Sequence, residues 1–452
     1  METFHIIHTN DFHSHFEYLP AVKRIILEKR ENYQRDHESY LLIDDGDNLD
    51  RSHPLTEATM GVANVNYLND LHFDAVTIGN NEGLGMNPAE LTRIYQKSHF
   101  KIIEGNVFEK NTKKLPNFAR RDYIFRIGNL KIGIFGYTAF FNSYLFNGWN
   151  AVSYEQLIAS EVEKLRPQVD VLILLSHLGI KVDESIADQC PLIDVIIGSH
   201  THHLLPHGEI RNGVLLAAAG KFFENTGFID LTLENRRILK KSAYTVPSEV
   251  LPKDILQNDI LSKKGDQIME QELVIENSPG FGFSNFEKSD LSELFVLALR
   301  NYTGCKYVIL NAGLFLNGLP KGKVTYREVF HALPHPIHPI IVKLTGVQLR
   351  SFITEIENTR NFLTKYPLKG VSFRGRIFGS MLYYGIEVDG SNAFFNHRKI
   401  VDDQVYSIVV PDNFRYLKYF PSIEQASKIK PFYGKFLREV LRDYLKNSYG
   451  RK

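Results

Sequence analysis

The sequence predicts a mixed α/β protein of two domains, in which an α/β layered domain precedes an α+β domain. Short apolar runs alternate with longer amphipathic stretches through the first half of the chain, which is typical of layered α/β folds. The apolar periodicity falls off after residue 238 and returns near residue 289. The 452 residues are enough for two or three domains, and 43% of them are hydrophobic, which suffices for sizeable cores.

The first domain is assigned to residues 1–238. Apolar runs of strand length predict buried strands, and amphipathic stretches between several of them predict helices. Near the end of this part, residues 213–234 indicate consecutive strands, so we expect a mixed sheet. The expected strands are 4–9, 40–45, 74–78, 101–108, 130–138, 170–176 and 194–199, and the expected helices are 18–32, 61–71, 87–99 and 153–165.

Residues 239–288 are polar and are assigned to the connection between the domains, with one helix over 251–273. The second domain, residues 289–452, is expected to begin with a helix over 289–304. Asp290 and Glu293 resemble a capping box for it, and Gly304 suits its C-terminal end. Strands over 306–313 and 338–346, a helix over 347–359, a β-rich stretch over 376–411 and a helix over 431–447 are expected to follow.

Charge and cysteine content exclude several classes of protein. The 53 Lys and Arg balance 52 Asp and Glu, so the net charge gives no indication of long nucleic acid or a membrane surface as a partner. Two cysteines, Cys190 and Cys305, exclude a disulfide-rich secreted scaffold. The sequence lacks a signal-peptide pattern at its start and any apolar run near the roughly 20 residues that span a bilayer. We therefore expect a cytoplasmic protein.

Five of the strand-like runs in the first half end in side chains that bind metals. In α/β sheets, the carboxyl ends of the strands are where functional sites assemble, and the adjacent glycines permit tight turns there. Two of the histidines are separated by one residue, which places them on one side of an extended segment. The candidate ligands are Asp11, His13, Asp47, Asn80, His177, His200 and His202.

Seven ligands are too many for one ion, but two ions with four protein ligands each need seven residues if they share one. Asp47 is the best bridging residue, because it has two oxygens, follows a glycine and stands alone in its motif. Two ions at about 3.5–4 Å clamp the attacking and leaving oxygens of phosphoryl transfer. Mixed histidine and carboxylate ligands favour Mn, Fe, Co or Zn. Each motif alone also fits an ordinary core or surface residue, and it is their combination that predicts a dinuclear site.

With these motifs the chain resembles the calcineurin-like metallophosphoesterases. Over nearly its whole length it resembles the two-domain family of 5'-nucleotidases and UDP-sugar hydrolases. The resemblance implies a four-layer α/β/β/α sandwich and a C-terminal domain that recognises the substrate. It implies hydrolysis of a phosphoester or pyrophosphate bond in a nucleotide or nucleotide sugar by a metal-bridging hydroxide. By the same resemblance, one metal takes Asp11, His13, Asp47 and His202, and the other takes Asp47, Asn80, His177 and His200.

The sequence departs from that family directly after the metal-binding asparagine. The family's catalytic histidine is Asn81 here, and the aspartate that orients the histidine is Leu84. Asn81 can still donate an amide hydrogen bond to a phosphate oxygen, but it cannot be a cation or an acid. General acid–base help contributes about 10²–10⁴ in rate, so slower turnover or a good leaving group is expected.

The substrate-binding motifs of the second domain also differ. The family's motif that begins here at Asn311 has Leu316 in place of its arginine. The glycine-rich loop that carries a base-stacking aromatic is replaced by NFRYLKYFPS, residues 413–422. Tyr419 in that stretch and Phe378 are candidates for stacking on a base, at about 1–3 kcal/mol per base, and core packing is the alternative for each.

Two residues near Asp47 are candidate substitutes for the missing groups. Arg51 could bind a phosphate through two hydrogen bonds, and His53 could supply a proton. A surface charge and a turn histidine before Pro54 are the alternatives. Further along, His331, His335 and His338 are assigned to proline turns rather than to substrate contact.

Three functions therefore stay open from the sequence. The first is hydrolysis of a small, nucleotide-like phosphoester, with two divalent metal ions as cofactors. The second is a metal-bearing protein that binds a nucleotide-like ligand without turnover, which the complete ligand set disfavours. The third is a cyclic-nucleotide phosphodiesterase or nuclease, which the neutral net charge disfavours for long nucleic acid.

Overall fold

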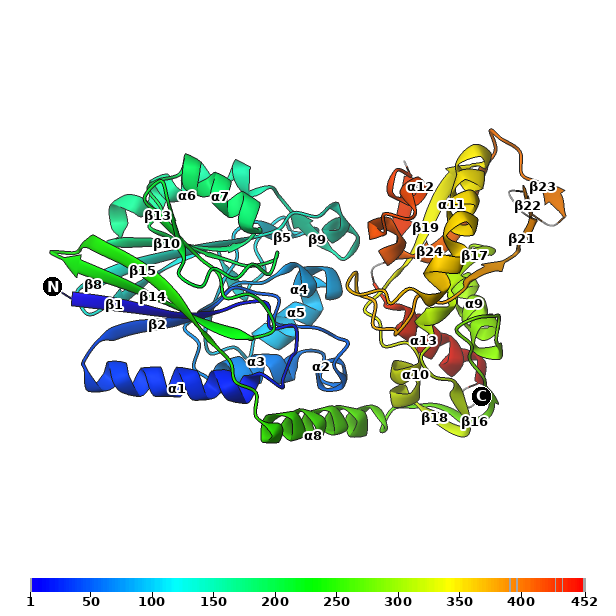
Figure 1. Ribbon diagram of the computed structural model, residues 1–452, viewed down its shortest axis with the longest axis horizontal. Coiled ribbons are helices and arrows are strands. Elements are labelled where there is room, and N and C mark those ends of the chain that lie inside the picture. Colours follow the sequence, from blue (N-terminus) through cyan, green and yellow to red (C-terminus); the bar gives the residue numbers. More distant parts are fainter. Residues whose placement is uncertain (1, 390–391, 396, 427, 433, 450–452) are drawn as a thin grey trace. The chain divides into compact units, whose positions relative to one another are not determined.

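The computed structural model describes residues 2–389, 392–395, 397–426, 428–432 and 434–449, and they form two compact units, residues 1–265 and 266–452 (Figure 1). The division falls within helix α8 (Pro252–Met269). The expected boundary at residue 238 instead falls inside strand β15 (Arg237–Pro247), which pairs with β14 (Asn225–Glu234). Part of the expected connection therefore completes the first sheet.

The first unit contains two sheets with many parallel strands. The seven-stranded sheet has the order β15-β14-β1-β2-β3-β4-β6. The six-stranded sheet has the order β12-β13-β11-β10-β8-β7, in which β12 is Glu209–Arg211. Antiparallel pairing of β14 with β1 and of β7 with β8 makes both sheets mixed, as the sequence predicts. The parallel strands of the first sheet are β1 (Glu2–Thr9), β2 (Ser39–Asp44), β3 (Ala75–Val76), β4 (Lys101–Ile103) and β6 (Ala119–Arg120). Those of the second are β8 (Leu130–Thr138), β10 (Val171–His177), β11 (Val195–Gly198) and β13 (Val214–Ala217).

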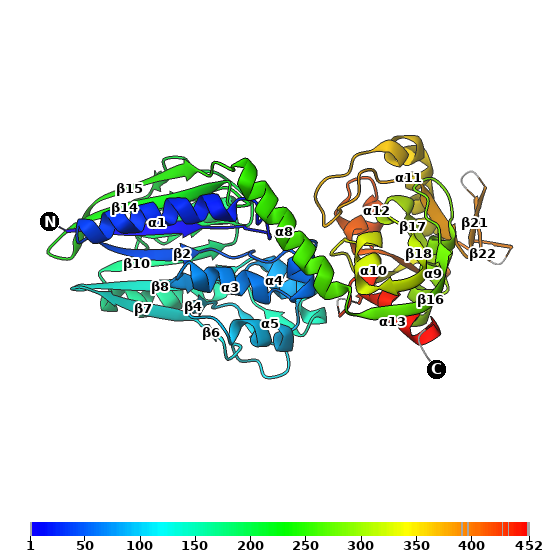
Figure 2. The ribbon, with the colours of Figure 1, turned by 90° about the horizontal axis from the view of Figure 1, so that it is seen from below.

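Buried side chains on both faces explain why the central strands are continuous apolar runs. In β10, Ile173 and Leu175 pack against residues of the first sheet, whereas Leu172 and Leu174 pack on the outer side with helix residues. Helices α6 (Ile158–Leu165) and α7 (Ile180–Gln189) cover that outer face (Figure 1). Helices α1 (Leu19–Arg35), α3 (Val62–Asp70) and α5 (Pro88–Tyr95) lie beside the first sheet (Figure 2). This arrangement confirms the α/β/β/α sandwich.

Several boundaries differ from the predicted ones for local reasons. The expected strand 101–108 is split, because the carboxylate of Glu104 accepts hydrogen bonds from the backbone N–H groups of Asn106 and Val107 and turns the chain. The second piece, β5 (Val107–Glu109), pairs with β9 (Trp149–Ala151). The expected strand 74–78 shortens to the two residues of β3, and the chain then enters helix α4 (Asn80–Gly85). Strand β7 (Asp122–Ile127) and helix α7 have no counterpart in the prediction.

The second unit is built around a five-stranded sheet of order β20-β17-β24-β19-β25. Helix α9 (Asp290–Thr303) confirms the helix expected over 289–304 and ends at Gly304, but its N-cap is Ser289, which accepts a hydrogen bond from the N–H of Ser292. The last helix begins later than expected because residues 428–431 form an edge strand. The strands are β17 (Tyr307–Asn311), β19 (Pro339–Thr345), β20 (Met381–Tyr384), β24 (Val405–Pro411) and β25 (Lys428–Pro431), and the other long helices are α11 (Gly346–Lys365) and α13 (Leu437–Tyr449).

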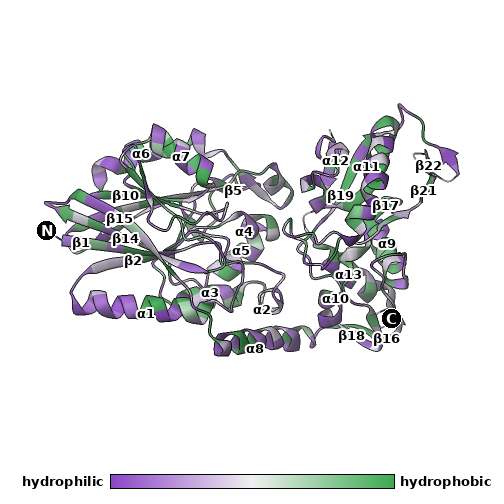
Figure 3. Ribbon diagram, in the orientation of Figure 1, coloured by the Kyte–Doolittle hydropathy of each residue, from purple (hydrophilic) through white to green (hydrophobic). Residues whose placement is uncertain are grey.

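Smaller elements complete the second unit. Strands β16 (Leu273–Phe281) and β18 (Leu319–Thr325) form an antiparallel pair, and helix α10 (Tyr326–Ala332) follows directly. Strands β21 (Ile386–Asp389), β22 (Asn392–Phe395) and β23 (Arg398–Lys399) form a separate small sheet. Hydrophobic residues concentrate in the strands, whereas the helices alternate between polar and apolar positions (Figure 3). Within the described ranges, the chain contains no helix with both the length and the apolarity that crossing a bilayer requires.

His53 lies at the N-terminus of helix α2 (Pro54–Ala58) and is a source of pH-dependent stability in the first unit. Its Nδ1 accepts a hydrogen bond from the N–H of Leu55, and its Nε2 lies 3.1 Å from the hydroxyl of Ser262. Burial lowers the pKa of His53 to about 4. The folded unit therefore holds this ring neutral at pH values where an unfolded chain, with an ordinary pKa of about 6.5, protonates it.

We predict that the unit loses stability as the pH falls from 6.5 toward 4, because the unfolded state then binds a proton that the folded state does not. Between pH 6.5 and 5 this residue contributes a loss of about 2 kcal/mol. His53→Asn keeps a favourable N-cap and removes the titrating ring. The fluorescence of Trp149, the single tryptophan, follows unfolding of this unit in urea. If the unfolding free energy depended on pH equally in the wild type and the variant, the prediction would be contradicted.

Candidate metal centre

The predicted ligands meet because the carboxyl ends of both sheets lie at one edge of the first unit. Asp11, Asp47 and Asn80 follow the adjacent parallel strands β1, β2 and β3, while His177 and His200 lie at the ends of β10 and β11. The side-chain oxygen of Asn80 lies 3.2 Å from Nε2 of His177 and 2.7 Å from Nδ1 of His200. Ligands from the two sheets are therefore in contact.

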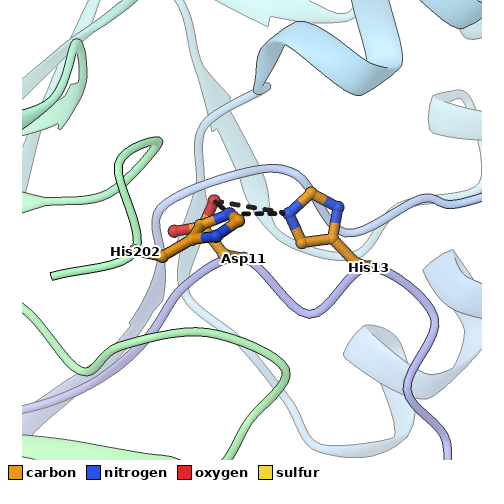
Figure 4. A group of neighbouring side chains, drawn as sticks. All are labelled: Asp11, His13 and His202. Carbon is orange, nitrogen blue, oxygen red and sulfur yellow. Dashed lines mark hydrogen bonds and ion pairs between the residues drawn. The ribbon is translucent and has the colours of Figure 1, made fainter. Parts of the chain in front are cut away.

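Asp11, His13 and His202 form the first group (Figure 4). The Nε2 atoms of the two histidines are 3.1 Å apart, and Oδ1 of Asp11 lies 3.6 Å from His13 and 3.4 Å from His202. All three side chains point toward one another in Figure 4. Asp11 is buried, and its Oδ1 has no hydrogen-bond partner. A buried carboxylate oxygen without a hydrogen bond is costly unless a cation or a proton reaches it.

Asp11, Asp47 and His177 form the second group, and all three are buried. Oδ2 of Asp47 lies 3.4 Å from Nε2 of His177 and 3.7 Å from Nε2 of His13. A single carboxylate oxygen thus faces one histidine from each sheet. This is the placement that a bridging ligand needs.

The backbone of these loops is held in an uncommon conformation. Five of the seven predicted ligands have positive φ values, a region that non-glycine residues seldom occupy. Gly46 and Gly79 allow the strand ends to approach: a Cβ on Gly79 would lie 2.0 Å from Oδ1 of Asp47, and one on Gly46 would lie 2.7 Å from the nitrogen of Gly79. The five are Asp11 (51°), His13 (47°), Asp47 (52°), His200 (68°) and His202 (58°).

Residues behind the ligands orient them. Nδ1 of His177 lies 2.8 Å from the carbonyl oxygen of Asp45, which also accepts a hydrogen bond from the hydroxyl of Ser199. A proton on Nδ1 satisfies that carbonyl and leaves the lone pair of Nε2 facing the cluster. The amide of Asn10 donates to Oδ2 of Asp11 at 2.8 Å. Asp45, Ser199 and Asn10 are not among the residues for which the sequence predicts a role.

Glu82 holds the Asp47 loop against helix α4 and was also overlooked as a functional residue. Its carboxylate accepts hydrogen bonds from the backbone N–H groups of Gly79 at 2.8 Å, Leu49 at 2.9 Å and Asp47 at 3.2 Å. Glu82 is fully buried. Burial, together with the charge of Asp47, raises the pKa of Glu82 to about 7. Its place as the third residue of a helix with a glycine N-cap is the sequence signal that indicates this role.

Negative charge dominates the centre. Burial on its own lowers the pKa of His177, but the carboxylates of Asp47, Asp11 and Asp45 outweigh burial and raise that pKa well above 6.5. Burial raises the pKa of Asp45 well above its usual range, so the negative charge comes mainly from Asp11 and Asp47, whose pKa values neighbouring histidines lower. Carboxylate oxygens, an amide oxygen and imidazole nitrogens thus converge and favour a positive species between them. The donor set and the unpartnered oxygen of Asp11 fit divalent metal ions.

The two candidate substitutes near Asp47 make other contacts. The guanidinium of Arg51 is buried and forms two hydrogen bonds with the carboxylate of Glu57, at 2.8 and 3.1 Å. The donors that would bind a phosphate bidentately are therefore engaged within the protein. His53 caps helix α2 and faces α8, as described above, so the prediction that it supplies a proton has no support in its contacts.

The candidate substrate residues of the second unit divide into buried and exposed ones. Phe378 is fully buried and packs against Phe414 and Phe420, so its predicted stacking on a base is wrong for this conformation. Asn311 is also fully buried, and its amide donates to the carbonyl of Phe378 at 2.7 Å, which makes it a support for that loop. Tyr419 is half-buried and remains within reach of solvent.

The three histidines of the proline-rich segment have protein partners. His335 is fully buried and lies 2.8 Å from the carbonyl oxygen of Leu314. His338 lies 3.1 Å from Asp412, and His331 lies 2.8 Å from Asp266. These contacts agree with the structural role assigned to this segment.

Comparison with known proteins defines the class. Residues 4–204 match the calcineurin-like phosphoesterase family, and residues 274–414 match the 5'-nucleotidase C-terminal domain. The chain therefore belongs to the calcineurin-like phosphoesterases that carry a 5'-nucleotidase C-terminal domain, and it is a hydrolase. The resemblance found in the sequence is confirmed. Members of this family use divalent metals, in agreement with the candidate ligand groups.

Particular relatives extend over the whole chain. The protein is 35% identical over 457 residues to the uncharacterized metallophosphoesterase YunD of Bacillus subtilis, covering 97% of this chain and 98% of the relative. The putative 5'-nucleotidase of Staphylococcus aureus has a TM-score of 0.68 at 16% identity, covering 100% of this chain and 98% of that one. The NAD nucleotidase of Haemophilus influenzae has a TM-score of 0.65 at 16% identity, covering 99% and 96%. These two structures share the fold.

Glu82→Gln tests the role of the buried carboxylate. A glutamine has one acceptor oxygen, so its amide nitrogen would face a backbone N–H that now donates to Glu82. We expect a loss of about 1–3 kcal/mol in the unfolding free energy of the first unit, measured by Trp149 fluorescence in urea. The control is Glu90→Gln in helix α5, where the carboxylate accepts one backbone N–H, from Asn87, and the expected loss is below about 1 kcal/mol. Equal losses in both variants would refute this role.

Proposed function

We propose that the protein hydrolyses a phosphoester or pyrophosphate bond of a small nucleotide-like molecule at a centre of two divalent metal ions. The observation that carries the proposal is Oδ2 of Asp47, which faces His13 on one side and His177 on the other. The candidate ligands favour Mn, Co, Zn or Fe, because they combine imidazole nitrogens with carboxylate oxygens. One ion would be held by Asp11, His13, Asp47 and His202, and the other by Asp47, Asn80, His177 and His200.

Divalent ions at these positions would polarise the phosphate oxygens and activate a water molecule for attack on phosphorus. The chain supplies the geometry. Asp11 and Asp47 concentrate negative charge, the carbonyl of Asp45 fixes the ring of His177, and the buried second sheet holds His177 and His200 in place. Phe222 stacks on His15 at 3.7 Å between ring centres and lies edge-on to His13, which limits the access of water to that side of the cluster.

Residue 81 favours substrates whose leaving group departs without protonation. The side chain at this position is a neutral amide, which provides neither a positive charge nor an acidic proton. Missing acid–base help of about 10²–10⁴ in rate matters most for a poor leaving group such as a sugar hydroxyl. We therefore place pyrophosphates and activated esters ahead of nucleoside 5'-monophosphates among the substrates.

The second unit supplies features that suit an anionic, planar substrate. Residues 266–452 contain 25 Lys and Arg against 18 Asp and Glu, whereas residues 1–265 contain 28 against 34. Tyr419 lies 5.6 Å from Phe362 and 5.9 Å from Tyr366 between ring centres, and Lys418 lies over its ring. Phe362 is 51% exposed. Such a cluster can stack on a base, at about 1–3 kcal/mol for each base.

The cellular compartment is part of the proposal. Cys190 and Cys305 are both free thiols, and Cys305 is buried. Free thiols persist in a reducing compartment. We propose that the protein acts in the cytoplasm on a dissolved small molecule.

The activity test uses protein stripped with a chelator and reloaded with Mn or Co. We expect hydrolysis of NAD, a UDP-sugar and p-nitrophenyl phosphate, and slower release of phosphate from AMP. Asp47→Asn should lose bound metal and more than about 100-fold in turnover, since even outer-shell changes cost 10–100-fold. The control is Asp188→Asn, which removes an exposed partner of Arg211 and should change neither. Bound metal without turnover on any of these substrates would instead support the nucleotide-binding alternative.

A further inference from the structure

Asn81 contacts two of the candidate metal ligands at once. Its backbone N–H donates to Oδ1 of Asp47 at 2.8 Å. Its side-chain nitrogen lies 2.8 Å from Nδ1 of His13 and 3.2 Å from the carbonyl oxygen of Leu49. The residue therefore connects the loop after β1 with the loop after β2, at the point where helix α4 begins.

Each contact determines which atom of a ligand faces the centre. Because Oδ1 of Asp47 accepts from the N–H of Asn81, Oδ2 is the oxygen that faces His13 and His177. Because Nδ1 of His13 is engaged by the amide, Nε2 is the nitrogen that faces Asp11 and His202. Removing the side chain would take away the contact that engages Nδ1 of His13.

The hydrogen-bonding positions of the amide are occupied within the protein. The nitrogen serves His13 and Leu49, and the oxygen lies 3.3 Å from the side-chain nitrogen of Asn80. A donor to a substrate phosphate would have to give up one of these contacts. We infer that Asn81 is a positioning residue that orients His13 for metal binding. This inference rests on the proposed metal centre.

An amide suits this task because it can present either a donor or an acceptor. Coordination of a metal through Nε2 of His13 requires the ring proton on Nδ1. The present arrangement satisfies the ring with the proton on Nε2. A half-turn of the amide places its oxygen against a proton on Nδ1, and in exchange it gives up the contacts with Leu49 and Asn80. Aspartate has the same shape as asparagine but can only accept hydrogen bonds. Leucine has a similar size and neither donates nor accepts them. These two substitutions therefore separate hydrogen bonding from packing.

The experiment measures metal affinity without substrate. Chelator-stripped wild type, Asn81→Asp and Asn81→Leu are titrated with Co²⁺ in competition with an indicator, and the visible spectrum of the bound ion is recorded. We expect the Kd of Asn81→Leu to rise by about 10–100-fold with an altered spectrum, as for other residues behind a metal ligand. Asn81→Asp should bind at least as tightly as the wild type, because its acceptor favours the required proton position.

A matched control separates this effect from damage to helix α4. Asn147 donates its side-chain N–H groups to the carbonyls of Gly83 and Leu84, so it supports the same helix without touching a ligand. Asn147→Leu should lower the thermal stability and change the Kd for Co²⁺ by less than about threefold, since its contact lies outside the ligand shell. If Asn81→Leu does not fold, Asn81→Ala replaces it, with the same expected rise in Kd.

Two outcomes would overturn the inference. If the Asn81→Leu protein binds Co²⁺ as tightly as the wild type, the inference is wrong. Weaker inhibition of its hydrolysis of p-nitrophenyl phosphate by inorganic phosphate, at saturating metal, would then identify residue 81 as a phosphate contact. If the Asn147→Leu control weakens metal binding as much as Asn81→Leu, the effect belongs to the helix as a whole. A wild type that binds no metal would refute the proposed function as well, which distinguishes the two failures.

Discussion

The convergence of buried acceptor atoms where two sheets end is the constraint on which the rest of the first unit depends. Oxygens of Asp11, Asp47 and Asn80 lie 2.7–3.4 Å from ring nitrogens of His177, His200 and His202, which follow strands of the other sheet. Such atoms repel one another unless a cation or a proton lies between them, and burial strengthens the repulsion because the local dielectric is low. The surrounding fold therefore has to hold the ligands against their own electrostatics.

The fold meets this demand in two ways. The sheets contribute rigidity, because residues such as Ile6, Ile43, Ile134 and Ile173 fill the space between them without exposure to solvent. The loops contribute specific hydrogen bonds that leave few rotations open to the candidate ligands. The carboxylate of Glu82 holds the loop of Asp47, and the carbonyl of Asp45 holds the ring of His177. Backbone conformations with positive φ, which cost of order 1–3 kcal/mol each, persist because both contributions over-determine them.

The second unit shows how a family motif can keep its position and change its contacts. Phe378 occupies a place where the resemblance implies base stacking, but it is enclosed by other aromatic rings. Aromatic surface is available instead around Tyr419, beside lysine side chains. At Asn81 the change is of the same kind, because the side chain lies where the resemblance implies a catalytic residue and contacts the candidate ligand His13. The side chains at these two positions thus have other contacts than the resemblance implies, while the scaffold and the candidate ligands are kept.

The sequence by itself determined the layered α/β fold and the set of candidate metal ligands. Strands such as Val171–His177 bury both faces and so appear as continuous apolar runs, and parallel strands bring the residues after them to one edge whatever the loops do. Only the tertiary structure decided which side chains are accessible. Arg51 is held by Glu57, Phe378 is buried, and Asn81 reaches His13 from 68 positions along the chain. Such contacts depend on how separate loops approach one another, and no local pattern of residues encodes that distance.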